Sequence, residues 1–178
     1  MSCEESKGFA GQFDRFGYAP FVARRGSLTG SLQIDDAGLH MIGLLTDGKQ
    51  SPAVLLHRTM AITNAGALAG DYLLTLAAIE PVEMEGHVRL RILSNGKASL
   101  RGTLGDGTSF FERTFVSSDS TIPWFVPLYS HRGIILGSLE ISGETVHGKA
   151  RWFRPGNARS VRYPNGFGLV IGVNGARE

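Results

Sequence analysis

Arginine and aromatic residues gather near the end of the chain, in the segment RWFRPGNARSVRYPNGF at 151–167. Aromatic rings beside arginine can stack on sugars or bases and can bind anionic groups. We therefore take five residues of this segment as the candidate ligand-binding site: Arg151, Trp152, Arg154, Arg162 and Tyr163. The alternative is structural, because Trp152 continues the apolar series Val146, Gly148 and Ala150 and can equally plug a core while the arginines are solvated.

Residue types that commonly perform catalysis are scattered. The five histidines lack the i, i+2 or i, i+4 pairs that build a metal site, so we expect neither a metal nor another cofactor. The motif GSLTG has Leu28 where a nucleophile elbow needs serine. Asp35 and Asp36 precede a glycine between two alternating segments, which favours a turn over a carboxylate pair. We expect no enzymatic activity, with a hydrolase of dispersed site as the remote alternative.

The composition is that of a globular protein. A chain of 178 residues with 42% hydrophobic and 19% charged residues suits one domain with a sizeable core. The formal net charge of +2 is too small to imply a nucleic-acid partner. No apolar run approaches the length of a membrane span, and the start MSCEESKGF lacks the apolar core of a signal peptide.

The single cysteine, Cys3, excludes an internal disulfide framework. The simplest interpretation is an incidental thiol in an N-terminal tail over residues 1–12. The alternative is the lipid-bearing cysteine of a lipoprotein whose signal sequence was replaced.

Glycine is abundant, at 24 residues, and it recurs beside Asp, Asn and Ser as in a protein of many tight turns. Spacings of roughly 8–12 residues between turn motifs are typical of an antiparallel sandwich or barrel. Asp-Gly and Asn-Gly are the strongest of these motifs, because type I′ hairpins need positive φ at both central residues. The expected turns are at Arg25-Gly26, Asp36-Ala37-Gly38, Asp47-Gly48, Asn64-Ala65-Gly66, Asn95-Gly96, Asp106-Gly107, Arg132-Gly133, Ser142-Gly143, Pro155-Gly156 and Asn165-Gly166.

Between the turns the pattern alternates with a period of two, as in 88–92, 98–104 and 146–152. This alternation predicts strands with one buried and one solvated face. Residues 53–69 are the only helical candidate, and Asn64 and Gly66 interrupt them.

Glycine at inward strand positions marks sharp coiling or close backbone approach, which favours a barrel over a sandwich. These glycines are Gly30, Gly43, Gly102, Gly137 and Gly148.

The segment IPWFVPLY contains two prolines, which cannot donate ladder hydrogen bonds. Pro123 and Pro127 therefore predict an edge strand or bulges. Its side chains divide into two sets, Trp124, Val126 and Leu128 on one face and Phe125 and Tyr129 on the other. We expect both faces to be buried.

The stretches GYAPFVARRGSLTGSL and GHVRLRILSNGKASLRGTL share a glycine, an alternating strand, a turn and then SLTGSL against SLRGTL. We interpret them as parts of two half-repeats, approximately 17–70 and 86–154. The expected fold is all-β, an antiparallel meander of about 10–12 strands in two similar halves, closed into a barrel or a strongly coiled sandwich. It would form a single domain over 13–174.

Four linked motifs resemble a family of uncharacterised glycine-rich β-barrel modules. The stretches SLRGTLGDGTSF, IPWFVPLYSHRGIILGSLEI, RWFRP and RYPNGF are similar, in order and spacing, to motifs of modules in large secreted or surface proteins of Verrucomicrobia and Planctomycetes. The match departs where Pro123 precedes Trp124 and where Asn165 replaces a small residue.

This resemblance implies an extracellular or cell-surface module within a larger protein, and it carries no catalytic residues. We therefore expect a non-enzymatic module for adhesion, spacing or carbohydrate contact, with carbohydrate or neighbouring modules as partners. The alternative is a barrel of the lipocalin type that carries a small apolar ligand in its mouth.

Overall fold

The computed structural model describes residues 12–22, 28–78, 84–158 and 160–178, and it is almost entirely β, with 63% strand and 3% helix. Cys3 and nearly all of the expected N-terminal tail lie outside these residues. Where the sequence predicts one domain over 13–174, the chain divides into two compact units, one ending at Arg58 and one running from Thr59 to Glu178.

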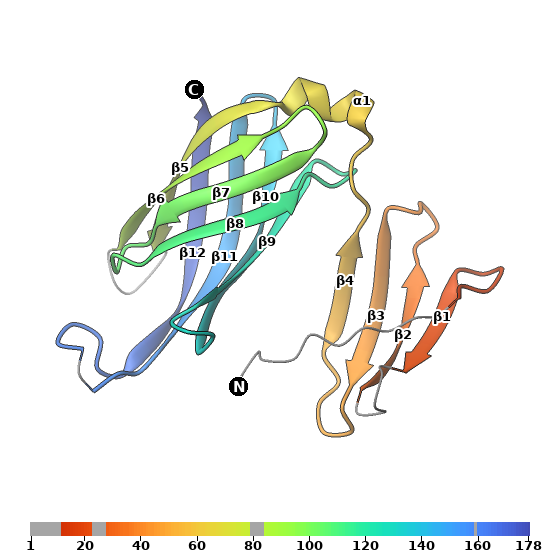
Figure 1. Ribbon diagram of the computed structural model, residues 1–178, viewed down its shortest axis with the longest axis horizontal. Helices are drawn as coiled ribbons and strands as arrows, with labels where there is room; N and C mark the ends of the chain where they lie inside the picture. Colours follow the sequence, from red (N-terminus) through yellow and green to blue (C-terminus); the bar gives the residue numbers. More distant parts are fainter. Residues whose placement is uncertain (1–11, 23–27, 79–83, 159) are drawn as a thin grey trace. The chain divides into compact units, whose positions relative to one another are not determined.

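The smaller unit is a four-stranded antiparallel meander in the order β1-β2-β3-β4 (Figure 1). Its strands are β1 (Tyr18–Val22), β2 (Thr29–Ile34), β3 (His40–Thr46) and β4 (Ala53–His57). The turn after β3 uses Asp47, whose carboxylate accepts the backbone N–H groups of Lys49 and Gln50, each at 2.8 Å. Gly48 follows with φ +84°, which is the conformation that selects glycine there.

The larger unit begins with two short helical turns and continues as eight strands. The turns are α1 (Ile62–Ala65) and η1 (Gly66–Leu68), and they occupy the end of the one helical candidate, since β4 takes its start. The strands are β5 (Gly70–Ala78), β6 (Glu85–Ile92), β7 (Lys97–Thr103), β8 (Ser109–Phe115), β9 (Thr121–Leu128), β10 (Gly133–Ser142), β11 (Thr145–Pro155) and β12 (Gly166–Arg177). No helix in the described ranges is long and apolar enough to cross a membrane.

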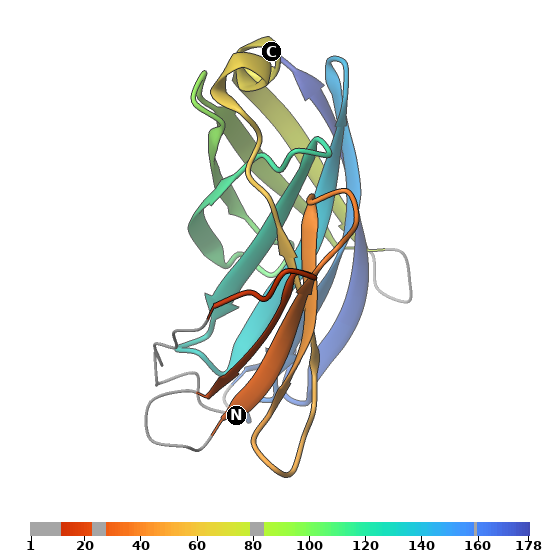
Figure 2. The same ribbon diagram turned by 90° about the vertical axis from the view of Figure 1, so that its right-hand side faces the viewer.

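The eight strands form one antiparallel sheet that curls almost into a closed barrel (Figures 1 and 2). Its order is β8-β7-β6-β5-β12-β11-β10-β9. Strands β5 and β12, the first and last of this unit along the chain, therefore pair, for example at Leu76 and Val173. The sheet is open between β8 and β9, where the Thr114 hydroxyl donates to the Pro123 carbonyl at 2.6 Å. The predicted all-β antiparallel fold of about 10–12 strands is confirmed.

Strand β9, on one side of the opening, has the chemistry of a protected edge. Pro123 and Pro127 lie in β9, which confirms the predicted edge strand. Trp124, Val126 and Leu128 are buried as expected. Burial of both faces was wrong for Phe125, which is 50% exposed, because the outer face of an edge strand has no layer above it.

The interior of the larger unit is filled by the inward residues of all eight strands. The largest of them include Tyr72, Phe110, Trp124 and Trp152. The Tyr72 hydroxyl donates to the Leu68 carbonyl at 2.9 Å, so its polar end is satisfied where the core meets η1.

Sharp coiling of the sheet needs glycine where strands approach closely. A methyl group added at Gly137 would overlap the Lys149 carbonyl oxygen, whereas at Gly168, on the outer side, it would meet nothing within 4 Å. The expected role of Gly137 as a point of close backbone approach is confirmed.

Most of the expected turns lie in the connections between strands, where Gly38, Gly48, Gly96, Gly107 and Gly143 have positive φ, as does Gly166 at the start of β12. Two differ. Asn64-Ala65-Gly66 lies in the helical turns. Gly133 begins β10, and the reversal before it uses Tyr129, Ser130 and His131 at positive φ instead.

The Arg25-Gly26 turn lies outside the described residues. The proposed half-repeats 17–70 and 86–154 fall largely in different units, and their duplication stays a prediction.

Candidate functional site

The five predicted site residues occupy three environments. Arg151 is exposed on the outer face of β11, whereas Trp152 is 2% exposed and lies in the core. Arg154 lies near the end of β11 and is half-buried. Arg162 and Tyr163 belong to the loop between β11 and β12. The structure thus brings Trp152, Arg154, Arg162 and Tyr163 to one end of the barrel and leaves Arg151 apart.

A buried polar network closes that end. Arg154 Nη1 donates to Asp106 Oδ2 at 2.6 Å, and the Tyr129 hydroxyl donates to the same oxygen at 2.7 Å. Trp152 Nε1 in turn donates to the Tyr129 hydroxyl at 3.1 Å. The side chain of Asp106 is 0% exposed, so its charge depends on these donors for compensation.

Aromatic rings surround the guanidinium of Arg154. It lies over the rings of Tyr129 and Tyr163, at 5.3 and 4.7 Å from their centroids, and Arg162 lies over Tyr163 at 5.4 Å. Phe167 packs edge-on against both Trp152 and Tyr163, with centroids 4.7 and 5.2 Å apart. Sequence spacing suggested this gathering, but Asp106 and Tyr129 were absent from the predicted site.

Burial of the phenol, and next its hydrogen bond to the Asp106 carboxylate, raises the pKa of Tyr129 to about 12. Tyr129 therefore stays protonated near neutral pH and acts as a donor within the network. The polar groups of Asp106, Tyr129 and Trp152 are directed at one another, as in a structural closure of the barrel. The part of the structural alternative that places Trp152 in the core is confirmed, and ligand contact by the five residues stays a prediction.

A second constellation lies on the outer face of β6, β7 and β8, which we call the β6–β8 face. Strand register places its side chains in three rows, each crossing the three strands. These rows are Leu93, Lys97 and Phe115; Arg91, Ser99 and Arg113; and Arg89, Arg101 and Phe111.

Ion pairs neutralise two of the five cations on this face. Arg91 makes a two-pronged contact with Asp71, at 2.9 Å on each oxygen, and this hydrogen bonding lowers the pKa of Asp71. Arg89 contacts Glu178 at 3.2 Å. Within the described parts of the chain, no carboxylate forms an ion pair with the remaining three cations, Lys97, Arg101 and Arg113.

A hollow of about 890 Å³ lies on the β6–β8 face, bordered by the chain at Thr59 and Met60. Three cations, Arg91, Lys97 and Arg113, line it, and the described residues of its wall include no acidic side chain. Phe111, which is 52% exposed, and Phe115 supply ring surface in the same wall. This site was not predicted from the sequence, because its residues come from three alternating strands, each of which is unremarkable alone.

Arg151 lies on the outer face of β10–β12 among apolar side chains. Its register neighbours are Leu136 and Val170, and together with Phe153 they line a shallow hollow of about 360 Å³ above Gly168. Arg151 therefore faces the outside of the sheet, whereas Trp152 faces the core.

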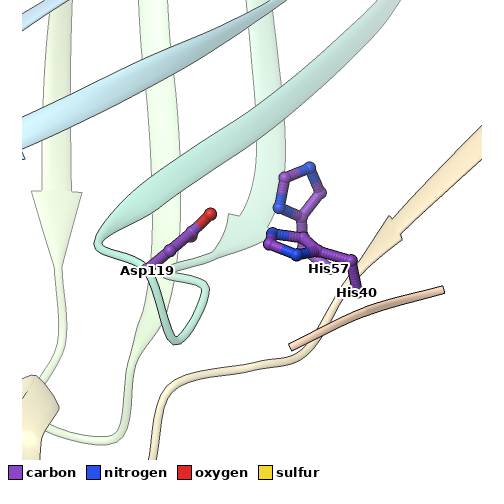
Figure 3. Close-up of side chains that lie close together, drawn as sticks. All are labelled: His40, His57 and Asp119. Carbon is purple, nitrogen blue, oxygen red and sulfur yellow. The ribbon is translucent and has the colours of Figure 1, made fainter. Parts of the chain in front are cut away.

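Two histidines of the smaller unit face one another across β3 and β4. His40 and His57 are register partners, and their ring centroids are 5.0 Å apart (Figure 3). His40 Nδ1 is 2.8 Å from Asp35 Oδ2. Asp119, also labelled in Figure 3, belongs to the larger unit, where its carboxylate accepts the Thr121 hydroxyl at 2.8 Å.

The spacing of the histidines in the sequence does not show that His40 and His57 are neighbours. Counting outward from a two-residue turn at Asp47-Gly48 places Leu55 opposite His40, whereas the hairpin turns one residue later, with Asp47 paired to Gln50, and this register brings His57 opposite His40.

Neither the models of known protein families nor the curated proteins match this chain. The resemblance to bacterial surface modules therefore rests on its motifs alone and stays a prediction.

Proposed function

We propose that this protein is a non-enzymatic binding module that holds an anionic carbohydrate on the β6–β8 face. The observation that carries the proposal is the hollow walled by Arg91, Lys97 and Arg113 together with Phe111 and Phe115, without an acidic residue among the described residues that line it. Operation outside the cell or at its surface is part of the proposal and is supported by the motif resemblance.

The charge distribution on this face supports an anionic ligand. Arg89 and Arg101 are directly opposite one another on β6 and β7, and like charges in such a pair destabilise a sheet. Glu178 compensates Arg89, but no described carboxylate pairs with Arg101. A bound anion would offset this repulsion. Binding would therefore relieve an interaction that destabilises the free protein.

The sparse arrangement of the cations favours a carbohydrate over a nucleic acid. Lys97 and Arg101 are four residues apart on one strand, a separation of roughly 13 Å, and Arg113 lies on the next strand, level with Ser99. Three isolated charges on a chain of net charge +2 fall short of the basic stripe typical of nucleic-acid binding. Anionic sugars need fewer cations, and Phe111 and Phe115 offer apolar surface for sugar rings.

The filled interior supports a surface site over the lipocalin-type carrier. A carrier needs ligand-sized space inside the barrel, whereas Trp124, Trp152 and Tyr72 occupy this interior. The hollow of the β6–β8 face instead lies on the outside of the sheet.

The test is binding of a polyuronate, measured by isothermal titration in low salt. The variant Lys97→Gln/Arg101→Gln/Arg113→Gln removes three cations that have no ion-pair partner among the described residues, so its fold should be retained. We expect affinity to fall about tenfold or more, since exposed charge contacts each contribute up to about 1 kcal/mol. Lys149→Gln, a change of an exposed cation on β11, is the matched control and should bind as the wild type does.

Binding of neutral glucan and of single-stranded DNA is measured for comparison with the polyuronate. Polyuronate binding that weakens in the triple variant and with added salt supports the proposal. Equal loss in the Lys149 control, or tighter binding of DNA than of polyuronate, overturns it.

A further inference from the structure

We propose that His40 and His57 of the smaller unit form a binding site for a divalent transition-metal ion, with Asp35 as the residue that orients His40. This site is separate from the β6–β8 face, and it departs from the absence of a metal expected from the sequence. All three residues belong to the smaller unit.

The backbone of the β3–β4 hairpin brings the two imidazoles together. The Arg58 N–H donates to the Leu39 carbonyl at 2.8 Å, and the Leu45 N–H donates to the Pro52 carbonyl at 3.1 Å. These bonds join residues directly opposite one another, so His40 and His57, one step inward from the first pair, form a non-hydrogen-bonded pair. Such pairs have the closer side chains of the two kinds in an antiparallel ladder.

Asp35 gives His40 the arrangement of a metal-binding imidazole. Its Oδ2 lies 2.8 Å from His40 Nδ1, while Oδ1 accepts the Leu39 backbone N–H at 2.8 Å. The Leu39 contact fixes the carboxylate within the turn, and the other oxygen favours the tautomer with a proton on Nδ1. His40 Nε2 is then the lone-pair nitrogen, as in carboxylate–histidine–metal arrangements.

The distance between the rings suits closure on one ion. A ring nitrogen of His40 and one of His57 lie within 4.8 Å of each other. In tetrahedral coordination, two zinc–nitrogen bonds of about 2.0–2.1 Å place the nitrogens about 3.3 Å apart, so the pair must approach by up to about 1.5 Å. The rings are edge-to-face at 82°, and histidine χ2 rotates over a broad range, so both lone pairs can be aimed at a shared ion.

The donor set selects the class of metal. Neutral imidazoles suit Zn²⁺, Ni²⁺ and Cu²⁺, whereas Ca²⁺ and Mg²⁺ require oxygen ligands. Two imidazoles leave coordination positions for water, so we expect reversible binding that a chelator removes.

The test uses the full chain with Cys3→Ser, because a thiolate also binds these metals. Zn²⁺ is titrated calorimetrically after treatment with EDTA. We expect one site, lost in His40→Gln and in His57→Gln and weakened about 10–100-fold in Asp35→Asn, which removes the charge that orients His40.

The matched control is His147→Gln. His147 also faces a carboxylate, that of Glu140 at 3.3 Å, but it does so on exposed positions of the larger unit and without a second imidazole among its described contacts. It should leave Zn²⁺ affinity unchanged.

Unfolding transitions recorded in EDTA show whether each variant is folded. They therefore distinguish the loss of a metal ligand from the loss of the fold. Cu²⁺ electron paramagnetic resonance gives an independent readout and should show nitrogen ligation that disappears in both ligand variants. The proposal is overturned if Zn²⁺ does not bind, or if folded His40→Gln and His57→Gln proteins bind it as tightly as the parent.

Discussion

Arg154 and Asp106 form an ion pair at 2.6 Å across 48 residues of sequence, with the aspartate side chain fully enclosed and the arginine 17% exposed. The pair ties the end of β11 to the turn between β7 and β8. Asp106 also accepts the Thr108 backbone N–H at 2.9 Å, so one carboxylate shapes the turn and anchors the distant strand.

Removal of one partner should expose the cost of this burial. Asp106→Ala leaves the guanidinium of Arg154 without its anion, and we expect the free energy of unfolding to fall by about 3–5 kcal/mol. Urea denaturation measures the change. The control is Asp71→Ala, which breaks the more exposed pair with Arg91 and should cost at most about 1 kcal/mol. Similar losses from the two changes would contradict a special role for burial.

The hydroxyl of Tyr129 should produce a distinct alkaline transition. Its pKa is about 12 in the folded protein against 10.0 for the ordinary phenol, so folding favours the protonated form. The resulting stabilisation is complete below pH 10 and is lost as pH rises from there through 12. Ultraviolet titration should show a late tyrosine ionisation, and Tyr129→Phe should remove that step. A wild-type titration in which every tyrosine ionises near pH 10 would contradict this expectation.

Two glycines of the same sheet should respond oppositely to alanine. Gly137→Ala places a methyl group against the Lys149 backbone, so we expect a loss of about 1–3 kcal/mol from overpacking. Gly168→Ala adds a methyl group to open space and should be neutral or stabilise by about 0.4–1 kcal/mol through the unfolded state. Thermal unfolding of both variants tests the contrast, and equal destabilisation would show that coiling does not depend on Gly137.

Local chemistry explains which parts of the fold could be predicted. Asp106-Gly107 and Asn95-Gly96 indicate tight turns through their own backbone preferences, and Pro123 and Pro127 indicate an edge because they lack a donor. Phe125 was placed incorrectly, since alternation shows that two faces differ and does not show what covers each. The pairing of β5 with β12 depends on contacts between distant segments and has no local signature.

The candidate sites divide in the same way. Clustering in sequence indicated the aromatic surroundings of Arg154, but its partner Asp106 comes from another hairpin and resembled an ordinary turn residue. Arg91, Lys97 and Arg113 meet only because three strands share one register. His40 and His57 lie in a single hairpin, but a turn at Asp47-Gly48 would have paired His40 with Leu55, because the observed register is displaced from that turn.

The eight-stranded sheet is open where the chain continues, between β8 and β9, and it is joined where chain-distant segments meet, between β5 and β12. Six of its seven strand pairings are therefore between neighbours along the chain, and one carries nearly all of the loop-closure entropy. The meanders β5–β8 and β9–β12 can each assemble from local contacts. The two meanders join only when β5 pairs with β12. Destabilising substitutions between β5 and β12 should slow folding to the extent that this pairing has formed in the folding transition state, and should otherwise speed unfolding.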